Sequence, residues 1–126
     1  MVTIKNEKEI EIIRQGGKFL AQIMQKLISE IKPGVSTGHL EKMACDLISQ
    51  VSGRPSFKGY QSKYDSVSYP TALCASINNE VVHSPALPSR ELKQGDIIGL
   101  DIGMEYPFFS NSADDKSVKR GYYTDM

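Results

Sequence analysis

The sequence predicts an α+β domain in which two helices pack on a mostly antiparallel sheet. Two stretches in the first half repeat their apolar residues with a helical period, and the second half contains short strand-like runs separated by turn residues. Helices followed by strands is the order typical of the α+β class. With 126 residues, 40% hydrophobic and 24% charged, the chain has the size and composition of a single globular domain, residues 1–126.

The first helix is expected from about Glu7 to Ile31. Asn6 and Glu9 form a capping pair at its start, and Pro33-Gly34 ends it. Gly16-Gly17 lies inside the helix and weakens it by about 1 kcal/mol per glycine. This predicts that the helix packs closely against a neighbour at that point.

The second helix is expected to begin at a cap formed by Ser36 or Thr37 and to end before Ser52 to Pro55. Its apolar residues, from Leu40 to Val51, share one face. Cys45 falls inside this run, so we interpret it as a core or near-core residue. His39 near the start of the helix is interpreted as a surface residue.

The remaining chain is predicted to form strands. Leu73 to Ile77 and Glu80 to His83 flank the turn-prone pair Asn78-Asn79, which indicates a hairpin. A further strand is expected over Ile97 to Tyr106, and a last strand begins at Tyr122 after a polar loop.

Charge and cysteine content exclude several classes of protein. Fifteen basic residues balance fifteen acidic ones without a basic cluster, which argues against direct nucleic-acid binding. Two cysteines are too few for a secreted disulfide framework. The N-terminus lacks the apolar segment of a signal peptide, and no apolar run reaches membrane-spanning length. We therefore expect a soluble cytoplasmic protein with reduced thiols and no membrane partner.

Asp101 is the most informative polar residue. In its strand the apolar residues alternate with Gly99, Asp101 and Gly103, so the carboxylate shares a face with two glycines. Aspartate is depleted in strands. Asp101 is therefore either an ordinary solvent-facing residue or part of a cation site.

Two further residues bear on the interpretation of Asp101 but leave both alternatives open. If the strand ending at Tyr106 pairs with the strand beginning at Tyr122, Asp125 lies roughly opposite Asp101. Facing carboxylates either raise a pKa or hold a metal, although Asp125 is equally well interpreted as an ordinary residue. His83 follows two valines and is either structural or catalytic.

The ordered motifs resemble a known family. Asn79-Glu80-Val81-Val82-His83, the segment Gly95 to Gly103, and Tyr122-Tyr123-Thr124-Asp125 closely resemble motifs of type I methionine aminopeptidases. Lys32 to Thr37, Ser56 to Tyr60 and Tyr69 to Asn78 extend the resemblance over nearly the whole chain. The resemblance implies the N-terminal half of a pita-bread (creatinase/aminopeptidase) fold of the M24 metallopeptidase type.

The resemblance also implies roles for individual residues. Asp101 and Asp125 match the aspartates that ligate two divalent metal ions, which Mn, Fe, Co or Zn would suit. His83 matches a catalytic histidine that contacts the scissile peptide. The pocket for the methionine side chain matches four residues: Phe57, Tyr60, Tyr69 and Cys74. The implied activity is two-metal hydrolysis that removes the N-terminal methionine of nascent peptides in the cytoplasm, with the ribosome as a further candidate partner.

Departures from the family pattern lead to one more expectation. His83-Ser84 replaces the usual His-Gly, residues 62–67 resemble an insertion, and the loop 107–120 is long. The chain ends at Met126, without the histidine and two glutamates that the second half of the family supplies. We therefore expect a fragment that is inactive alone. The alternative is a non-catalytic pita-bread module that binds peptide N-termini or a protein partner.

Overall fold

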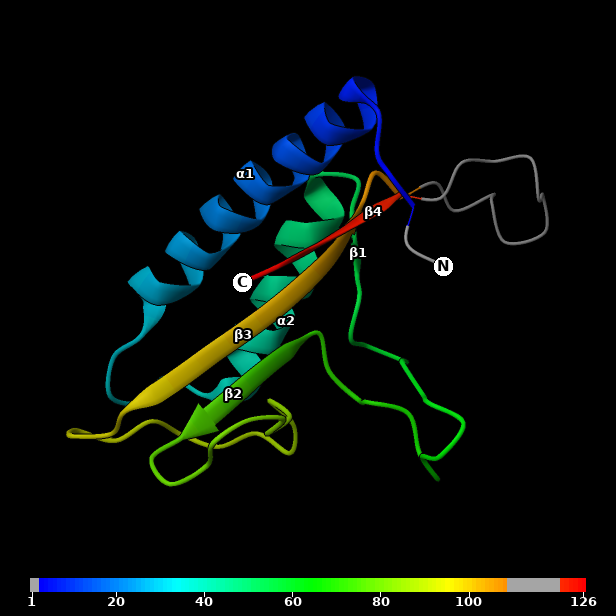
Figure 1. Ribbon diagram of the computed structural model, residues 1–126. Helices are drawn as coiled ribbons and strands as arrows, with labels where there is room; N and C mark the ends of the chain where they lie inside the picture. Colours follow the sequence, from blue (N-terminus) through cyan, green and yellow to red (C-terminus); the bar gives the residue numbers. More distant parts are fainter. Residues whose placement is uncertain (1–2, 109–120) are drawn as a thin grey trace.

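The computed structural model of the chain describes residues 3–108 and 121–126. Helices α1 (Glu7–Glu30) and α2 (Thr37–Gln50) pack on an antiparallel sheet (Figure 1). The strands are β1 (Arg54–Pro55), β2 (Leu73–Ile77), β3 (Ile98–Tyr106) and β4 (Tyr122–Asp125). The central strand is β3: β2 pairs with its first half, and β1 and β4 pair with its second half. The predicted α+β arrangement of helices on an antiparallel sheet is thus confirmed.

The first helix begins as its capping pair predicts. The Glu9 amide donates to the Asn6 side chain over 3.0 Å, and the Asn6 amide donates to the Glu9 carboxylate over 2.8 Å. Gly16 is buried, and a Cβ atom there would lie 3.3 Å from the Cβ of Tyr106, so the expected close packing holds at this glycine. At Gly17 the expectation is wrong, because an added Cβ would meet open space.

The second helix is capped by Ser36, whose hydroxyl accepts from the His39 amide over 3.1 Å. Thr37 is instead buried, and its hydroxyl donates to the Ala86 carbonyl over 2.6 Å. Cys45 is half-buried and His39 is exposed at the surface, as predicted. Within the described part of the chain, no helix has the length and apolar composition needed to cross a membrane.

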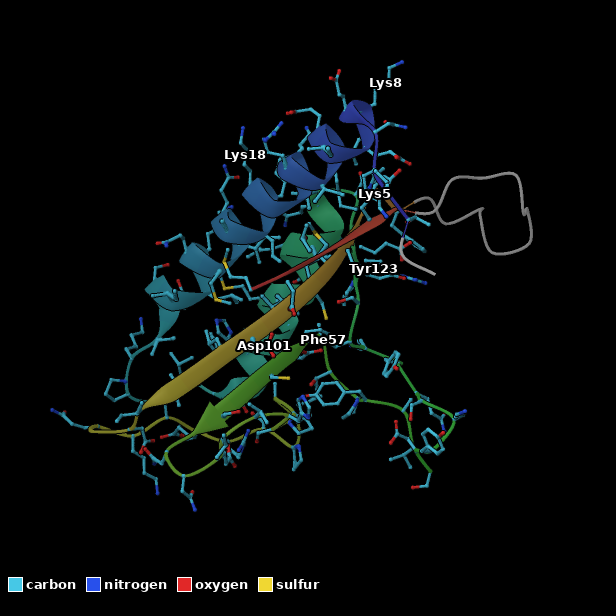
Figure 2. The ribbon with its side chains drawn as sticks, in the orientation of Figure 1. Lys5, Lys8, Lys18, Phe57, Asp101 and Tyr123 are labelled. Carbon is cyan, nitrogen blue, oxygen red and sulfur yellow. The ribbon has the colours of Figure 1, made fainter. Side chains whose placement is uncertain are left out.

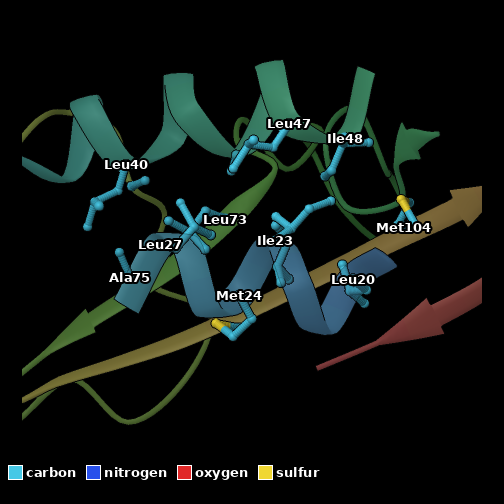
Figure 3. Packing of buried hydrophobic residues seen from close by; sticks show 13 residues of the cluster. Leu20, Ile23, Met24, Leu27, Leu40, Leu47, Ile48, Leu73, Ala75 and Met104 are labelled. Carbon is cyan, nitrogen blue, oxygen red and sulfur yellow. The ribbon is translucent and has the colours of Figure 1, made fainter. Parts of the chain in front are cut away.

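The hydrophobic core lies between the helices and one face of the sheet (Figure 3). Complete burial of each large aliphatic side chain contributes roughly 1.5–3 kcal/mol. The core includes Leu20, Ile23, Met24, Leu27, Leu40, Ala44, Leu47, Ile48, Leu73, Ala75, Ile102 and Met104. Since Ile102 and Met104 point into this core, the alternating residues of β3, including Asp101, occupy the opposite face.

The predicted hairpin is wrong in its second strand. Residues Leu73 to Ile77 pair with β3 and not with Glu80 to His83. The Glu80 amide donates to the Ile77 carbonyl over 3.1 Å, which turns the chain out of the ladder directly after β2. His83 has φ 57°, a left-handed conformation that a strand does not contain. The paired valines therefore belong to an exposed loop.

One other segment near the sheet differs from what the sequence indicated. Ser52 to Pro55 ends α2 as expected, but its last two residues also pair with β3 as the unpredicted strand β1. There Arg54 forms an ion pair with the buried carboxylate of Glu105. The long polar loop predicted over residues 107–120 falls mostly outside the described residues.

Candidate active site

A pocket of about 730 Å³ opens on the face of the sheet that carries Asp101. Figure 2 shows Asp101 on β3 and Phe57 beside it. Every site residue predicted from the sequence lines this one pocket: Phe57, Tyr60, Tyr69, Cys74, His83, Asp101 and Asp125. These residues are distant along the chain, and the fold brings them together because β2, β3, β4 and the loops before and after β2 converge there.

The two aspartates lie on the same face but not directly opposite each other. Asp125 pairs with Gly103, which is two residues from Asp101 along β3, so Asp125 is placed diagonally to Asp101. The two carboxylates, expected to lie roughly opposite each other, are therefore offset by two residues. Both side chains still line the same pocket, and the charge of Asp125 acts on Asp101. Carboxylate oxygens in such a pair are suitable donors for a divalent cation.

The electrostatics of the pair favour the protonated form of Asp101. Burial raises the pKa of Asp101 above its ordinary value, the neighbouring Asp125 carboxylate raises that pKa further, and His83 opposes the rise. A raised pKa in the folded state means that the carboxyl group favours folding at pH values below its unfolded pKa. This contribution is lost as the pH rises through the folded pKa.

In EDTA, Asp101→Asn is accordingly expected to melt at a higher temperature than the unchanged chain at pH 7. The advantage should shrink toward zero at pH 3, where Asp101 is protonated in both folded and unfolded states. Thermal melts across this pH range provide the measurement. A difference in melting temperature that does not change with pH would contradict the electrostatic origin.

The pocket wall beside the carboxylates is aromatic and contains a thiol. The Tyr69 hydroxyl and the Cys74 sulfur are 2.8 Å apart, and the rings of Phe57 and Tyr69 meet edge to face with centroids 6.4 Å apart. Burial, followed by the hydrogen bond to Cys74, raises the pKa of Tyr69 well above its ordinary value. Burial likewise raises the pKa of the Cys74 thiol, and the backbone of His83 bonds to its sulfur. This wall is therefore uncharged at neutral pH.

Gly103 allows the Phe57 ring to lie over β3. A Cβ atom at Gly103 would lie 2.2 Å from the Ser56 hydroxyl oxygen and 2.8 Å from the Phe57 ring, closer than such atoms come in proteins. At Gly99, the other glycine beside Asp101, an added Cβ would meet Ser76 at an ordinary 3.9 Å. Of the two glycines that share a face with Asp101, close packing therefore requires a glycine only at Gly103.

Gly103→Ala is expected to displace Ser56 and Phe57 and to lower the free energy of unfolding by about 1–3 kcal/mol, a typical cost of overpacking. The matched variant Gly99→Ala should cost less than about 1 kcal/mol because its new methyl group has space. Urea unfolding of both variants measures the difference. Equal costs at the two glycines would show that Phe57 does not depend on Gly103.

The loop before β2 forms the rim of the pocket. The Gly59 amide donates to the Tyr69 carbonyl over 2.8 Å and the Tyr69 amide donates to the Tyr60 carbonyl over 2.7 Å, so the two ends of the loop pair. The segment 62–67, interpreted as an insertion, lies beyond this pairing, and its residues Asp65 to Val67 line the pocket. The sequence marked this segment only as an insertion, because its side chains are ordinary loop residues.

The described residues contain part of a metal site at most. Within residues 3–108 and 121–126, no group of three or more His, Cys, Asp or Glu side chains is placed to hold a metal ion. Asp101 and Asp125 supply hard oxygen donors that fit a divalent cation, but a tight site needs more ligands than these two carboxylates.

The fold and the pocket agree with the comparison to known proteins. The chain belongs to metallopeptidase family M24, whose model matches residues 11–114. Its relatives are methionine aminopeptidases. The protein of Clostridium acetobutylicum is 42% identical over 103 residues, covering 82% of this chain and 39% of the relative. The protein of Helicobacter pylori is 40% identical, covering 89% and 42%. Methionine aminopeptidase 1 of Bacillus subtilis is 36% identical, covering 94% and 49%.

Solved structures give the same result. A methionine aminopeptidase from streptococci superposes with a TM-score of 0.81 at 29% identity, covering 99% of this chain and 49% of that structure. The enzyme of Thermotoga maritima gives a TM-score of 0.73 at 33% identity, covering 82% and 39%. This chain thus spans half or less of the length of these relatives.

Proposed function

We propose that this chain provides one half of a metal-dependent methionine aminopeptidase, which as a complete enzyme removes the N-terminal methionine from nascent proteins. The observation that carries the proposal is the single pocket in which Asp101, Asp125 and His83 meet an aromatic and thiol wall. The relatives described above, each named methionine aminopeptidase, support the same assignment. Action on nascent peptides near the ribosome, in the cytoplasm, follows from this proposal.

In the proposed site Asp101 and Asp125 hold divalent metal, for which Mn, Fe, Co and Zn are candidates. When bound, such ions supply an activated water and polarise the scissile carbonyl. The remaining ligands, by the family resemblance a histidine and two glutamates, come from the other half of the enzyme. The chain alone is therefore expected to bind metal weakly and to be inactive or nearly so.

The proposed role of the pocket wall is to hold the methionine side chain. An unbranched, polarizable thioether suits a slot formed by Phe57, Tyr69 and Cys74, because sulfur makes favourable contacts with aromatic rings. The Tyr69 hydroxyl is already engaged by Cys74, so no unsatisfied polar group disturbs the slot. Tyr60 lines the rim, and the proposed role of His83, which lines the same pocket as Asp101, is to contact the peptide group that follows the methionine.

One observation favours a second candidate function. The part of the chain that the structure describes has no third carboxylate, imidazole or thiolate in position to complete a metal site. A non-catalytic module that binds peptide N-termini in this pocket would need no such ligand. The two candidates differ in whether methionine is released.

Release of methionine from a Met-Ala-Ser peptide tests the proposal. The peptide is incubated with Mn²⁺ or Co²⁺ and with this chain or any longer product of its reading frame. Activity in the longer product, absent or very low in the chain alone, is the expected result. Absence of release from both, together with binding of the peptide, would favour the binding module.

A further inference from the structure

The loop that carries His83 leaves the sheet, and its middle residues Val81, Val82 and His83 are exposed. We name residues 80–84 the His83 arch. Val81 and Val82 are 86% and 65% exposed, so hydrophobic contacts do not hold this loop in place. His83 has φ 57°, and such left-handed conformations of residues other than glycine persist only where the surroundings impose them. Polar contacts at the two ends of the arch must therefore determine where the imidazole lies.

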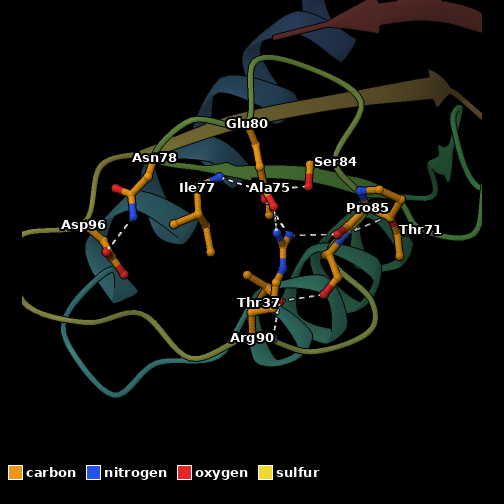
Figure 4. Close-up of polar contacts among 11 residues, drawn as sticks. Thr37, Thr71, Ala75, Ile77, Asn78, Glu80, Ser84, Pro85, Arg90 and Asp96 are labelled. Carbon is orange, nitrogen blue, oxygen red and sulfur yellow. Dashed lines mark hydrogen bonds and ion pairs between the residues drawn. The ribbon is translucent and has the colours of Figure 1, made fainter.

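One carboxylate closes both ends of the His83 arch (Figure 4). The Glu80 side chain accepts a hydrogen bond from the Ile77 amide over 2.7 Å, at the point where β2 ends. The same oxygen accepts from the Ser84 hydroxyl over 2.9 Å, at the point where the chain returns to β2. These bonds lower the pKa of Glu80, so the carboxylate is ionised at neutral pH.

The second oxygen of Glu80 forms an ion pair with Arg90. The other arm of the Arg90 guanidinium donates to the Ala75 carbonyl over 2.8 Å and to the Pro85 carbonyl over 3.0 Å. The Arg90 side chain thus binds the arch, the strand before it and the segment after it at once. The planar guanidinium presents two nitrogens in fixed positions to these three acceptors, whereas a lysine ammonium is a compact charge without this fork.

Arg90 is itself fixed to the start of α2. Its amide donates to the Thr37 hydroxyl over 2.9 Å, and the Thr37 amide donates to the Arg90 carbonyl over 2.8 Å. The arch is therefore connected through Arg90 to the buried end of a helix. Such a connection transmits the rigidity of the core to an exposed loop.

We propose that Glu80 and Arg90 are positioning residues for His83, and that their ion pair fixes the imidazole at the mouth of the pocket. The catalytic consequence rests on the proposed function, because His83 needs a defined position only if it contacts a substrate peptide. The Ser84 hydroxyl adds a hydrogen bond to Glu80 at a position where the family that the sequence resembles usually has a glycine. The serine at position 84 therefore has a structural role in the His83 arch.

The direct test is nuclear magnetic resonance of the chain carrying His39→Gln. The sequence contains two histidines, so His83 then gives the remaining imidazole signals. Nuclear Overhauser contacts from this ring to Asp101 and Cys74 report its position. Arg90→Lys keeps the charge but not the fork, and Glu80→Gln keeps an acceptor for the Ile77 amide but not the ion pair. Arg14→Lys is the matched control, since Arg14 pairs with Glu11 on the exposed surface of α1.

We expect the contacts of His83 to be lost in Arg90→Lys and Glu80→Gln while the core methyl signals stay unchanged. The control should keep both. Ser84→Gly removes the hydrogen bond between Ser84 and Glu80, and it should weaken the contacts of His83 without abolishing them. Contacts that survive in Arg90→Lys would overturn the proposal. Because this measurement needs no catalysis, it tests whether Glu80 and Arg90 position His83 even if methionine release is never observed.

Activity of a longer product adds a second criterion. Arg90→Lys should lower kcat/KM for Met-Ala-Ser by between about 10- and 100-fold, as small misplacements of a catalytic group do. Combining it with His83→Ala should cost no more than His83→Ala alone, because Arg90 acts through His83. Additive losses would show that Arg90 has a separate role.

Discussion

Asp101→Asn and Asp125→Asn are each expected to weaken binding of Mn²⁺ at the pocket by at least about tenfold, because affinity for such cations depends on the number of charged oxygen ligands. The two carboxylates line one pocket and share one face of the sheet. Replacing either by an amide removes half of the negative charge of the pair. Asp46→Asn is the matched control, since Asp46 lies exposed on α2 and pairs with Lys42.

Paramagnetic broadening of the histidine signals measures this effect. His83 lines the pocket with the aspartates, whereas His39 lies outside it. Millimolar Mn²⁺ should therefore broaden the His83 signals and leave those of His39 sharp in the unchanged chain and in Asp46→Asn. Equal broadening of both histidines, or broadening of His83 that persists in Asp125→Asn, would show that the aspartates do not bind the ion.

Glu41→Ala is expected to lower the free energy of unfolding by about 3 kcal/mol or more. The carboxylate is 4% exposed and accepts from the amides of Ala72 and Leu73 at about 3.0 Å. Each buried donor left without a partner costs roughly 1–3 kcal/mol. Glu41 also pairs with Lys58 over 3.3 Å, so it holds both ends of the loop that forms the pocket rim.

Urea unfolding of Glu41→Ala measures the loss, and two variants calibrate it. Lys58→Met removes the half-exposed partner and should cost less than about 1 kcal/mol. Glu11→Ala removes an exposed carboxylate of α1 and should change stability by no more than about 0.5 kcal/mol. A cost for Glu41→Ala as small as that for Glu11→Ala would mean that the amides of Ala72 and Leu73 find other partners.

Local periodicity explains why much of the fold could be predicted from the sequence. The apolar stripes of both helices, the capping pair Asn6 and Glu9, and the alternation in β3 depend on residues that are close in the chain. The same alternation placed Asp101 on the face away from the core. Family resemblance then selected the pocket residues, and the fold brings them together in one pocket.

The features that sequence analysis missed depend on partners distant in the chain. Val81 and Val82 resemble a strand, but the Glu80 carboxylate binds the Ile77 amide and turns the chain outward. The offset between Asp101 and Asp125 depends on the register of β4 against β3, which no local pattern specifies. Glu41 likewise shows no motif, because its partners are backbone amides about thirty residues away.

The most direct test of the proposed metal site is anomalous scattering from crystals of this chain soaked in Mn²⁺. We expect an anomalous peak in contact with the carboxylates of both Asp101 and Asp125, next to the wall formed by Tyr69 and Cys74. Mn²⁺ bound elsewhere on the surface, with no peak between these two carboxylates at saturating concentration, would contradict the assignment of Asp101 and Asp125 as metal ligands.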